Sequence, residues 1–213
     1  MRFSIIKVIL LVAVLAVVSV QMADAVPNPI GMLFKNRRVT TESLSDPSQL
    51  WFMNKVDHFN HQDTRLYKQR YFVNTTVWNK PSGPVFLQIG GEGPISSSYV
   101  QNLAMSSYAK LHGALQFAVE HRFYGLSYPL PTLATENLRL LSSQQALSDV
   151  AYFLEQVIPL YFPPGVKPLV VVFGCSYAGS LAGWFRLKYV QKKSSLFFPP
   201  LDLYVNYCFC LFF

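Results

Sequence analysis

The chain has 213 residues, of which 51% are apolar and 14% are charged. This composition excludes a disordered tail protein and supplies enough apolar material for one or two domains with a buried core. The 18 basic and 11 acidic side chains give a net charge of +7, but the basic residues are scattered along the chain. Because no basic stripe alternates with aromatic residues, we expect no nucleic acid among the partners.

The first 25 residues have the order of a cleavable secretory signal peptide. Two basic residues, Arg2 and Lys7, precede the apolar run Val8–Val18, and the stretch ends in the small-residue pattern Ala23-Asp24-Ala25. An uncleaved membrane anchor is the alternative, but the run is shorter than the ~20 residues that span a bilayer. The sequence therefore predicts a signal peptide over residues 1–25 and a secreted or lysosomal protein without a stable membrane span.

A glycosylation sequon and the cysteines bear on the same compartment. The sequon Asn74-Thr75-Thr76 predicts a glycan on Asn74. The three cysteines, Cys175, Cys208 and Cys210, cannot all pair within one chain, so the sequence is not that of a disulfide scaffold. Cys208 and Cys210 have no histidine or third cysteine near them, and we therefore expect no metal site.

Five segments are predicted to be extended or to form strands. Residues 26–46 are polar, carry two prolines and indicate an extended arm, whereas Leu66–Trp78 is rich in aromatic and β-branched residues and predicts one or two strands. The apolar run Pro84–Ile89 stops at Gly90-Gly91, as a buried parallel strand and its exit turn would. Two further buried strands are predicted over Ala114–Glu120 and Leu169–Phe173.

Three helices are predicted between and after these strands. They cover Tyr99–Leu111, ended by Gly113; Ser142–Ile158, which begins with a capping box of Ser142 and Gln145; and Tyr177–Tyr189. Strands that alternate with helices predict an α/β fold with a parallel sheet.

The junction of the last strand and its helix, Gly174–Gly179, carries the chemistry. A serine on a very tight strand-to-helix turn exposes its Oγ as a nucleophile, and the turn requires small residues two positions before and after it, here Gly174 and Ala178 around Ser176. The backbone N–H of Tyr177 would then stabilise an oxyanion at the helix N-terminus. A second oxyanion donor would come from Gly91, in the glycine loop after the earlier strand.

Each of these pieces has a plainer interpretation. The serine motif could be an ordinary strand-to-helix turn, and the glycine loop could be an ordinary tight turn. Their combination favours a nucleophile, because the motif follows a valine run, precedes a helix and is joined to a glycine loop after an earlier strand.

The chain also resembles a family, the secreted and lysosomal serine peptidases of the prolyl carboxypeptidase, dipeptidyl peptidase and thymus-specific serine protease type. The resemblance covers residues 51–189 through five ordered motifs: Lys55–Phe59, Ile89–Pro94, Glu120–Gly125, Leu141–Leu147 and Gly174–Gly179. It implies the N-terminal portion of an α/β-hydrolase domain over residues 26–189, ending its parallel sheet at the nucleophile elbow. It further implies cleavage of peptides next to proline without a cofactor, with Ser176 as nucleophile and Tyr177 and Gly91 as the oxyanion hole.

Other residues in these motifs are less strongly indicated as catalytic or substrate-binding residues. His58 and His121 both precede the nucleophile, whereas the hydrolase order is Ser, Asp, His, so we expect both to be structural. Glu92 would either bind the amino terminus of a peptide or hold its own loop. Cys175 stands where the family has glycine, and we expect a tolerated change there, with its side chain pointing away from the site.

The sequence after Ser176 sets a limit on the expected activity. Its 37 residues contain one acid, Asp202, and no histidine, so they cannot complete a catalytic triad. Residues 190–213 form an atypical apolar tail that departs from hydrolase sequence, as a retained intron, a frameshift or a misjoined gene model would. We therefore expect this chain to be an inactive, incomplete peptidase. The alternative is a non-catalytic secreted binding protein or decoy, and an esterase or lipase on the same fold ranks below both.

Overall fold

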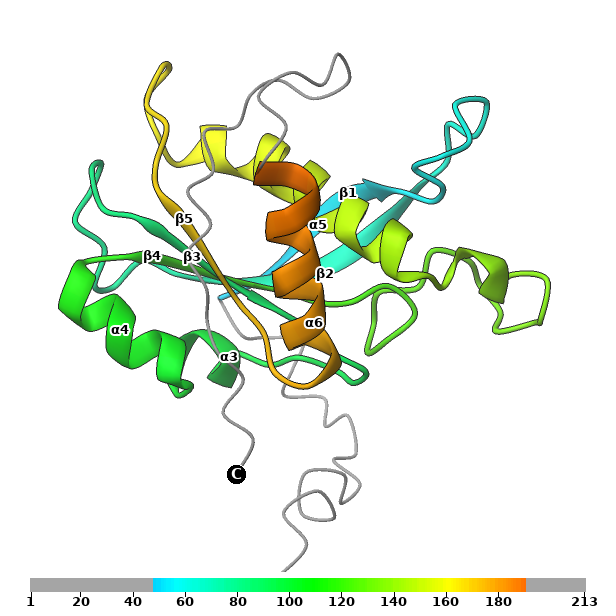
Figure 1. Cartoon of the computed structure of the whole chain (residues 1–213), viewed down its shortest axis with the longest axis horizontal. Coiled ribbons are helices and arrows are strands. Elements are labelled where there is room, and N and C mark those ends of the chain that lie inside the picture. The colour runs from blue at the N-terminus through cyan, green and yellow to red at the C-terminus, as the bar shows by residue number, and fades with distance from the viewer. Residues whose placement is uncertain (1–47, 191–213) are drawn as a thin grey trace, which may run out of the picture. The chain divides into compact units, whose positions relative to one another are not determined.

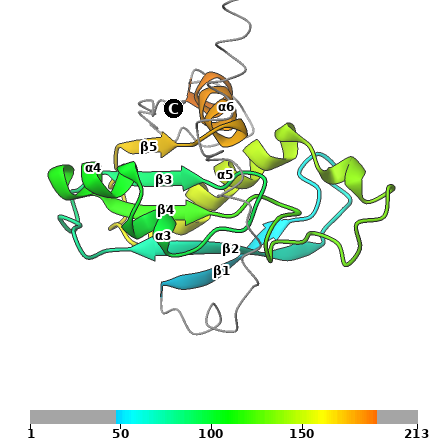
Figure 2. The ribbon, with the colours of Figure 1, turned by 90° about the horizontal axis from the view of Figure 1, so that it is seen from below.

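Five strands form one mixed sheet in the computed structural model, which describes residues 48–190. Their order across the sheet is β1-β2-β4-β3-β5 (Figure 2). The strands are β1 (Gln49–Lys55), β2 (Leu66–Asn74), β3 (Val85–Ile89), β4 (Leu115–Val119) and β5 (Val170–Phe173). The predicted signal peptide (1–25), the predicted arm (26–46) and all but the first residue of the predicted tail (190–213) lie outside the described residues.

Strand direction divides the sheet into two parts. The strands β4, β3 and β5 are parallel, with Val85 of β3 opposite both Leu115 of β4 and Val170 of β5. The strand β2 is antiparallel to β4 and also to β1, with which it forms a hairpin. The predicted parallel sheet is therefore confirmed for three strands, and the hairpin makes the whole sheet mixed.

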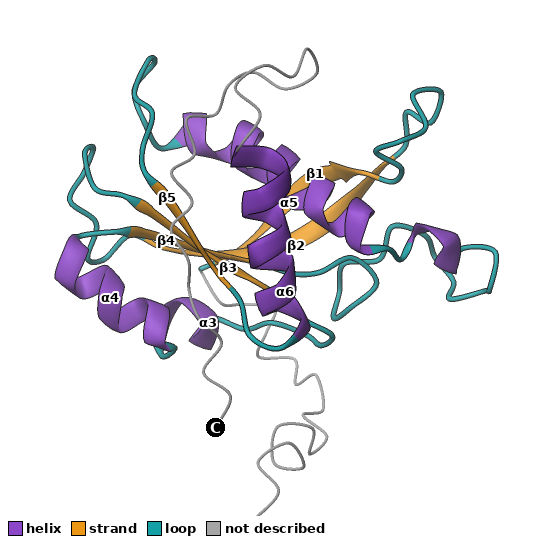
Figure 3. Ribbon diagram, viewed as in Figure 1, coloured by secondary structure: helices purple, strands orange, loops and turns teal. Residues whose placement is uncertain are grey.

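Helices cover both faces of the sheet, which explains the uninterrupted apolar runs of the central strands (Figures 1 and 3). Every residue of β3 and β4 is buried. Leu87 and Phe117 lie in the core beneath helices α5 (Ser143–Val157) and α6 (Tyr177–Phe185). Phe86 lies in a second core on the other face, with residues of α3 (Ser98–Gln101) and α4 (Ala104–His112).

The helices differ from their predicted bounds for local reasons. The single helix predicted over Tyr99–Leu111 is two helices, because Leu103 before α4 has extended backbone angles (φ −82°, ψ 168°). Gly113 ends α4 in the left-handed conformation at φ 60°, as predicted. The last predicted helix is α6 followed by a π-helical turn, Arg186–Val190. Two 3₁₀ turns flank α5, at Leu138–Leu140 before it and at Ile158–Leu160 after it.

The capping box predicted for α5 is only half formed. Ser142 caps the helix, and its Oγ accepts a hydrogen bond from the Gln145 backbone N–H at 3.3 Å. The Gln145 side chain does not return to the cap. Its Nε2 donates to Asp57 Oδ1 at 2.6 Å, and its Oε1 accepts from the His58 backbone N–H at 3.0 Å, so this residue holds the segment after β1.

Strand β1 was not predicted from the sequence, although in the structure its inward and outward side chains alternate. Leu50 and Phe52 pack against the core beside α5, and Asn54, the next inward residue of β1, is fully buried. A polar residue at an inward position obscures the apolar period of a strand. The Nδ2 of Asn54 donates to Gln69 Oε1 and to the backbone oxygen of Asp149, which satisfies its buried amide.

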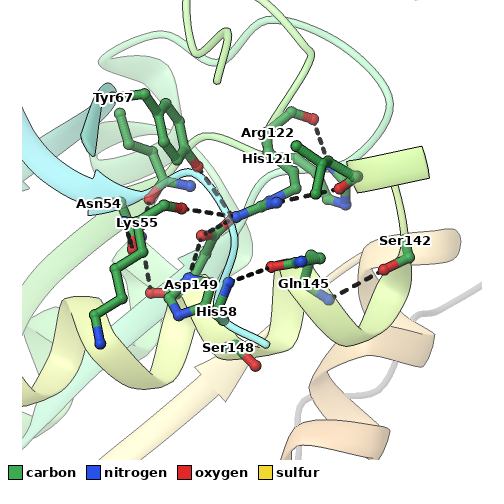
Figure 4. A network of polar contacts seen from close by, with 12 residues as sticks. Asn54, Lys55, His58, Tyr67, His121, Arg122, Ser142, Gln145, Ser148 and Asp149 are labelled. Carbon is green, nitrogen blue, oxygen red and sulfur yellow. Dashed lines mark hydrogen bonds and ion pairs between the residues drawn. The ribbon is translucent and has the colours of Figure 1, made fainter. Parts of the chain in front are cut away.

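A buried ion pair joins the sheet to α5. Arg122, just after β4, and Asp149 of α5 are both about fully buried, at 0% and 1% exposure. Arg122 Nε lies 2.6 Å from Asp149 Oδ2, and Arg122 Nη2 lies 2.7 Å from Asp149 Oδ1 (Figure 4). The same carboxylate accepts from Tyr67 Oη at 3.0 Å and contacts His58 Nε2 at 2.8 Å. Burial would raise the pKa of Asp149, but Arg122 and His58 hold it below its usual value.

The remaining N–H groups of Arg122 bind backbone carbonyls. Nη1 donates to the oxygens of Val56 and Leu140, and Nη2 donates to the oxygen of Lys55. All five guanidinium N–H donors thus have acceptors. These hydrogen bonds and the ion pair offset the desolvation penalty of burying the charge. One side chain thereby ties the ends of β1 and β4, the turn before α5 and α5 itself.

We expect Arg122→Met to lower the free energy of unfolding by about 3–5 kcal/mol, because it leaves Asp149 buried without its cation. Urea denaturation followed by circular dichroism measures the change. The matched control is Arg65→Met, which removes an exposed ion pair with Asp63 and should leave the midpoint unchanged. Equal midpoints for the two variants would contradict the importance assigned to the buried pair.

Candidate active site

The turn between β5 and α6 has the geometry of a nucleophile elbow. Ser176 is exposed and has φ 54° and ψ −129°, in a region that costs a non-glycine residue on the order of 1–3 kcal/mol. It immediately precedes Tyr177, the first residue of α6. The turn therefore presents the side chain of Ser176 at the carboxyl edge of the parallel strands, where a nucleophile on this kind of turn stands.

Steric constraints at Gly174 explain the small residues in the motif. A Cβ at Gly174 would lie 2.0 Å from the backbone oxygen of Ala178 and 2.7 Å from the backbone nitrogen of Gly179. The chain thus folds back on itself so closely that position 174 has no room for a side chain. Cys175, between Gly174 and the serine, is exposed.

The glycine loop after β3 lies against the first turn of α6. A Cβ built on Gly91 would lie 3.9 Å from the Cβ of Ala178, two residues after Ser176. Residues 91 and 177 therefore belong to neighbouring segments, as a two-donor oxyanion hole requires. The oxyanion roles of their N–H groups stay predictions.

A second buried ion pair holds this loop. Glu120, at the end of β4, pairs with Arg70 of β2, and both side chains are buried. Glu120 Oε1 accepts from the Ile95 backbone N–H at 3.1 Å, and Arg70 Nη2 donates to the Ile95 oxygen at 3.0 Å. The other carboxylate oxygen accepts from Leu126 N and Ser127 Oγ. The end of the Gly90–Pro94 loop is therefore fixed by two charged side chains from the sheet.

The carboxylate of Glu120 leaves no room for a side chain at position 125, which is a glycine. Gly125 has φ 59°, and a Cβ there would lie 1.9 Å from Glu120 Oε1. This explains the glycine that closes the Glu120–Gly125 motif.

His121 lies between this pair and the elbow. Its Nδ1 is 2.7 Å from the backbone oxygen of Arg122, and its Nε2 is 3.3 Å from Tyr177 Oη. The imidazole is 4% exposed, and this burial lowers its pKa below the ordinary 6.5, against the opposing effects of Asp149 and Glu92. The His121 ring centroid is 5.3 Å from that of Tyr124 and 5.5 Å from that of Tyr177.

Glu92 is exposed at the tip of the glycine loop, and its negative charge acts on Tyr124 and Tyr177, the two tyrosines in ring contact with His121. Burial raises the pKa of both Tyr124 and Tyr177, and the negative charge of Glu92 raises each further. Glu92 therefore supplies an acidic group on the rim beside the elbow, accessible to a ligand. Binding of a peptide amino terminus there stays a prediction.

The remaining predicted residues lie elsewhere. His58 contacts Asp149 in the buried network of Figure 4, in line with the structural role expected for it. Asn74, at the end of β2, is partly buried: its Nδ2 donates to the Val100 oxygen at 2.8 Å, and its Oδ1 accepts from Thr76 N and Oγ1. One amide hydrogen of Asn74 is thus donated to Val100, and the glycan expected on this residue stays a prediction.

Three further findings concern the described residues, 48–190. They contain no group of three or more His, Cys, Asp or Glu side chains that could hold a metal ion. None of the helices within this range is long and apolar enough to cross a membrane. A shallow hollow near the start of α5 is separate from the elbow motif and is lined by Asp57, Phe59, Arg139, Leu140, Ser142, Gln144 and Gln145.

Several contributors to the site were not predicted from the sequence. Arg70 and Glu120 are 50 positions apart and meet only because β2 and β4 are adjacent. The sequence assigns no role to Arg70, which lies within a predicted strand. It places Glu120 in a motif, beside His121 and Arg122 at a strand end where polar networks are common. The one available signal was a charged residue inside or directly after a predicted strand, since such a residue is buried only when it is paired.

We expect Gly174→Ala to disrupt the elbow and to lower the thermal midpoint, because its Cβ would overlap the backbone of Ala178. Gly183→Ala is the matched control: a Cβ at that α6 position meets nothing within 4 Å and should stabilise the helix by about 0.5–1 kcal/mol. Differential scanning calorimetry measures both. A tolerated alanine at 174 would contradict the close approach in this turn.

The buried His121 predicts a defined pH dependence of stability. Its pKa is lower in the folded chain than the ordinary 6.5, so the unfolded chain binds more protons as the pH falls below that value. The free energy of unfolding of the wild type should therefore fall between about pH 7 and pH 5, relative to that of His121→Gln. Urea titrations at several pH values measure the difference, and parallel curves for the two proteins would contradict it.

Comparison with known proteins places this site in a family. Residues 54–192 match the family model described as Serine carboxypeptidase S28. Human thymus-specific serine protease is 42% identical over 143 residues, covering 67% of this chain and 28% of that protein. Mouse lysosomal Pro-X carboxypeptidase is 36% identical over 150 residues, covering 67% and 29%. A Caenorhabditis elegans relative is 45% identical over 143 residues, covering 66% and 26%.

The chain thus spans between 26% and 29% of the length of these relatives. The matched segment holds the elbow, the glycine loop and both buried ion pairs. The resemblance predicted from five motifs and the α/β-hydrolase fold predicted with it are confirmed. The chain belongs to the serine carboxypeptidase S28 family of serine peptidases.

Proposed function

We propose that the protein is a serine peptidase in which Ser176 is the nucleophile. The observation that carries this proposal is an exposed serine at φ 54° between β5 and α6, beside the glycine loop. In the proposed reaction, Ser176 Oγ forms a bond to the carbonyl carbon of the substrate and gives its proton to a base. The C–N bond then breaks, the amine leaves with a proton, and water hydrolyses the acyl-enzyme.

The N–H groups of Tyr177 and Gly91 are proposed to donate to the oxyanion of the tetrahedral intermediate. Supporting this, the two segments are in contact through Gly91 and Ala178, and Glu120 and Arg70 fix the loop. A preformed pair of donors lowers the barrier because it needs no reorganisation when the charge develops. No cofactor takes part in this mechanism.

We assign the general base to neither His58 nor His121. His58 is engaged with Asp149, and His121 with Arg122 O and Tyr177 Oη. The hydrolase order Ser, Asp, His instead requires both partners to follow the nucleophile. In the proposed mechanism they come from the part of the family domain that this chain does not cover, and activity is therefore a property of the whole protein.

The proposed substrate is a peptide with proline next to the cleaved bond, in line with the name of the Pro-X carboxypeptidase relative. Aromatic rings of Tyr124 and Tyr177 flank the elbow and would contact a pyrrolidine ring favourably. Glu92 is proposed to bind a substrate amino group. A signal peptide over residues 1–25, a glycan on Asn74 and a secreted or lysosomal location complete the proposal.

The test uses the whole protein, secreted from cells, with fluorogenic peptides that contain proline or alanine at the cleaved bond. We expect preferential cleavage of the proline peptides and a fall in kcat/KM of at least about 10⁴-fold in Ser176→Ala. Ser180→Ala, an exposed serine one turn along α6, is the matched control and should retain activity. Peptide binding that survives Ser176→Ala without any hydrolysis would favour a binding protein or decoy instead.

A further inference from the structure

The contacts of His121 define which of its nitrogens carries the proton. Nδ1 lies 2.7 Å from the backbone oxygen of Arg122, and a carbonyl oxygen can only accept a hydrogen bond. Nδ1 must therefore carry a hydrogen. In the neutral imidazole that leaves Nε2 as an acceptor, which faces Tyr177 Oη at 3.3 Å.

The surroundings favour this neutral form. His121 is buried against the elbow, and burial disfavours its charged state. The charged and titratable groups that act on it are Glu92 from the glycine loop, Arg122 beside it, Tyr124 and Tyr177 in ring contact, and Asp149 from α5. The cation of Arg122 opposes a second positive charge, whereas the two carboxylates favour one. The Tyr177 hydroxyl therefore donates its proton inward, to His121.

We infer that His121 is a positioning residue for the elbow and acts through Tyr177. Tyr177 follows the strained Ser176 directly and is the first residue of α6. Its backbone is restrained on one side by the helix and its side chain on the other by a hydrogen bond to the end of β4. His121 thereby holds Tyr177, the residue whose N–H would face the oxyanion. The catalytic role of this contact rests on the proposed function, whereas its geometry does not.

The inference explains why histidine occupies this position. A donor at the Nδ1 position is needed for the Arg122 oxygen, and an acceptor at the Nε2 position is needed for the Tyr177 hydroxyl. An imidazole provides both in one rigid, planar ring. Asparagine would reproduce only the Nδ1 donor, and glutamine can extend its amide oxygen to the position of Nε2.

The first measurement is long-range ¹H–¹⁵N correlation of the imidazole in the 213-residue chain at neutral pH. We expect a single tautomer with a protonated Nδ1 and an unprotonated Nε2. Tyr177→Phe deletes only the hydroxyl and should shift both the Nε2 resonance and the amide resonance of residue 177. Tyr108→Phe, at an exposed tyrosine of α4, is the control and should shift neither.

The second measurement compares two substitutions of the histidine. His121→Asn should move the amide resonance of residue 177, and His121→Gln should restore it toward the wild-type position. A protonated Nε2 in the wild type, or a residue 177 amide that does not move in Tyr177→Phe, would overturn the inference. The Tyr177 variant decides the matter alone where His121→Asn does not fold. None of these readouts requires hydrolysis, so their failure is distinct from failure of the proposed peptidase activity.

Discussion

The buried ion pair between Arg122 and Asp149 joins helix α5 to the end of strand β4. Its two charges are removed from water, and only complete hydrogen bonding makes this tolerable. Because Arg122 also binds the carbonyls of Lys55, Val56 and Leu140, the pair fixes where β1 ends, where α5 begins and how α5 lies on the sheet. A substitution here would therefore disturb the hairpin, the helix and the carboxyl edge of the sheet together.

Three consecutive residues just after β4 hold different parts of the site in place. Glu120 fixes the end of the glycine loop through Ile95 N–H, His121 reaches Tyr177 at the elbow, and Arg122 holds α5. These three residues lie just after β4, and their side chains contact three separate segments of the chain. The strain at Ser176 persists because the surrounding segments are anchored in this way.

The fold was predictable where a single segment carries its own signal. The runs that became β3, β4 and β5, the cap Ser142 and the left-handed Gly113 follow from local apolar periods and backbone preferences. Prediction failed where a distant partner decides the outcome. Gln145 forms half of a capping box in sequence, yet Asp57 and His58 take its side chain, and β1 was missed because its inward Asn54 is satisfied by Gln69 and Asp149.

The sequence alone was enough to predict the family, the small residues around Ser176 and the order of strand, turn and helix, because these depend on residues adjacent in the chain. The tertiary structure alone decided that Gly91 lies beside Ala178, that Arg70 pairs with Glu120, and that His121 faces Tyr177. Each of these three contacts joins residues at least 50 positions apart along the chain. The first and third contacts exist because the parallel strands bring their carboxyl ends to one edge, and the second exists because the antiparallel strand β2 lies beside β4. No local pattern in the sequence encodes these placements.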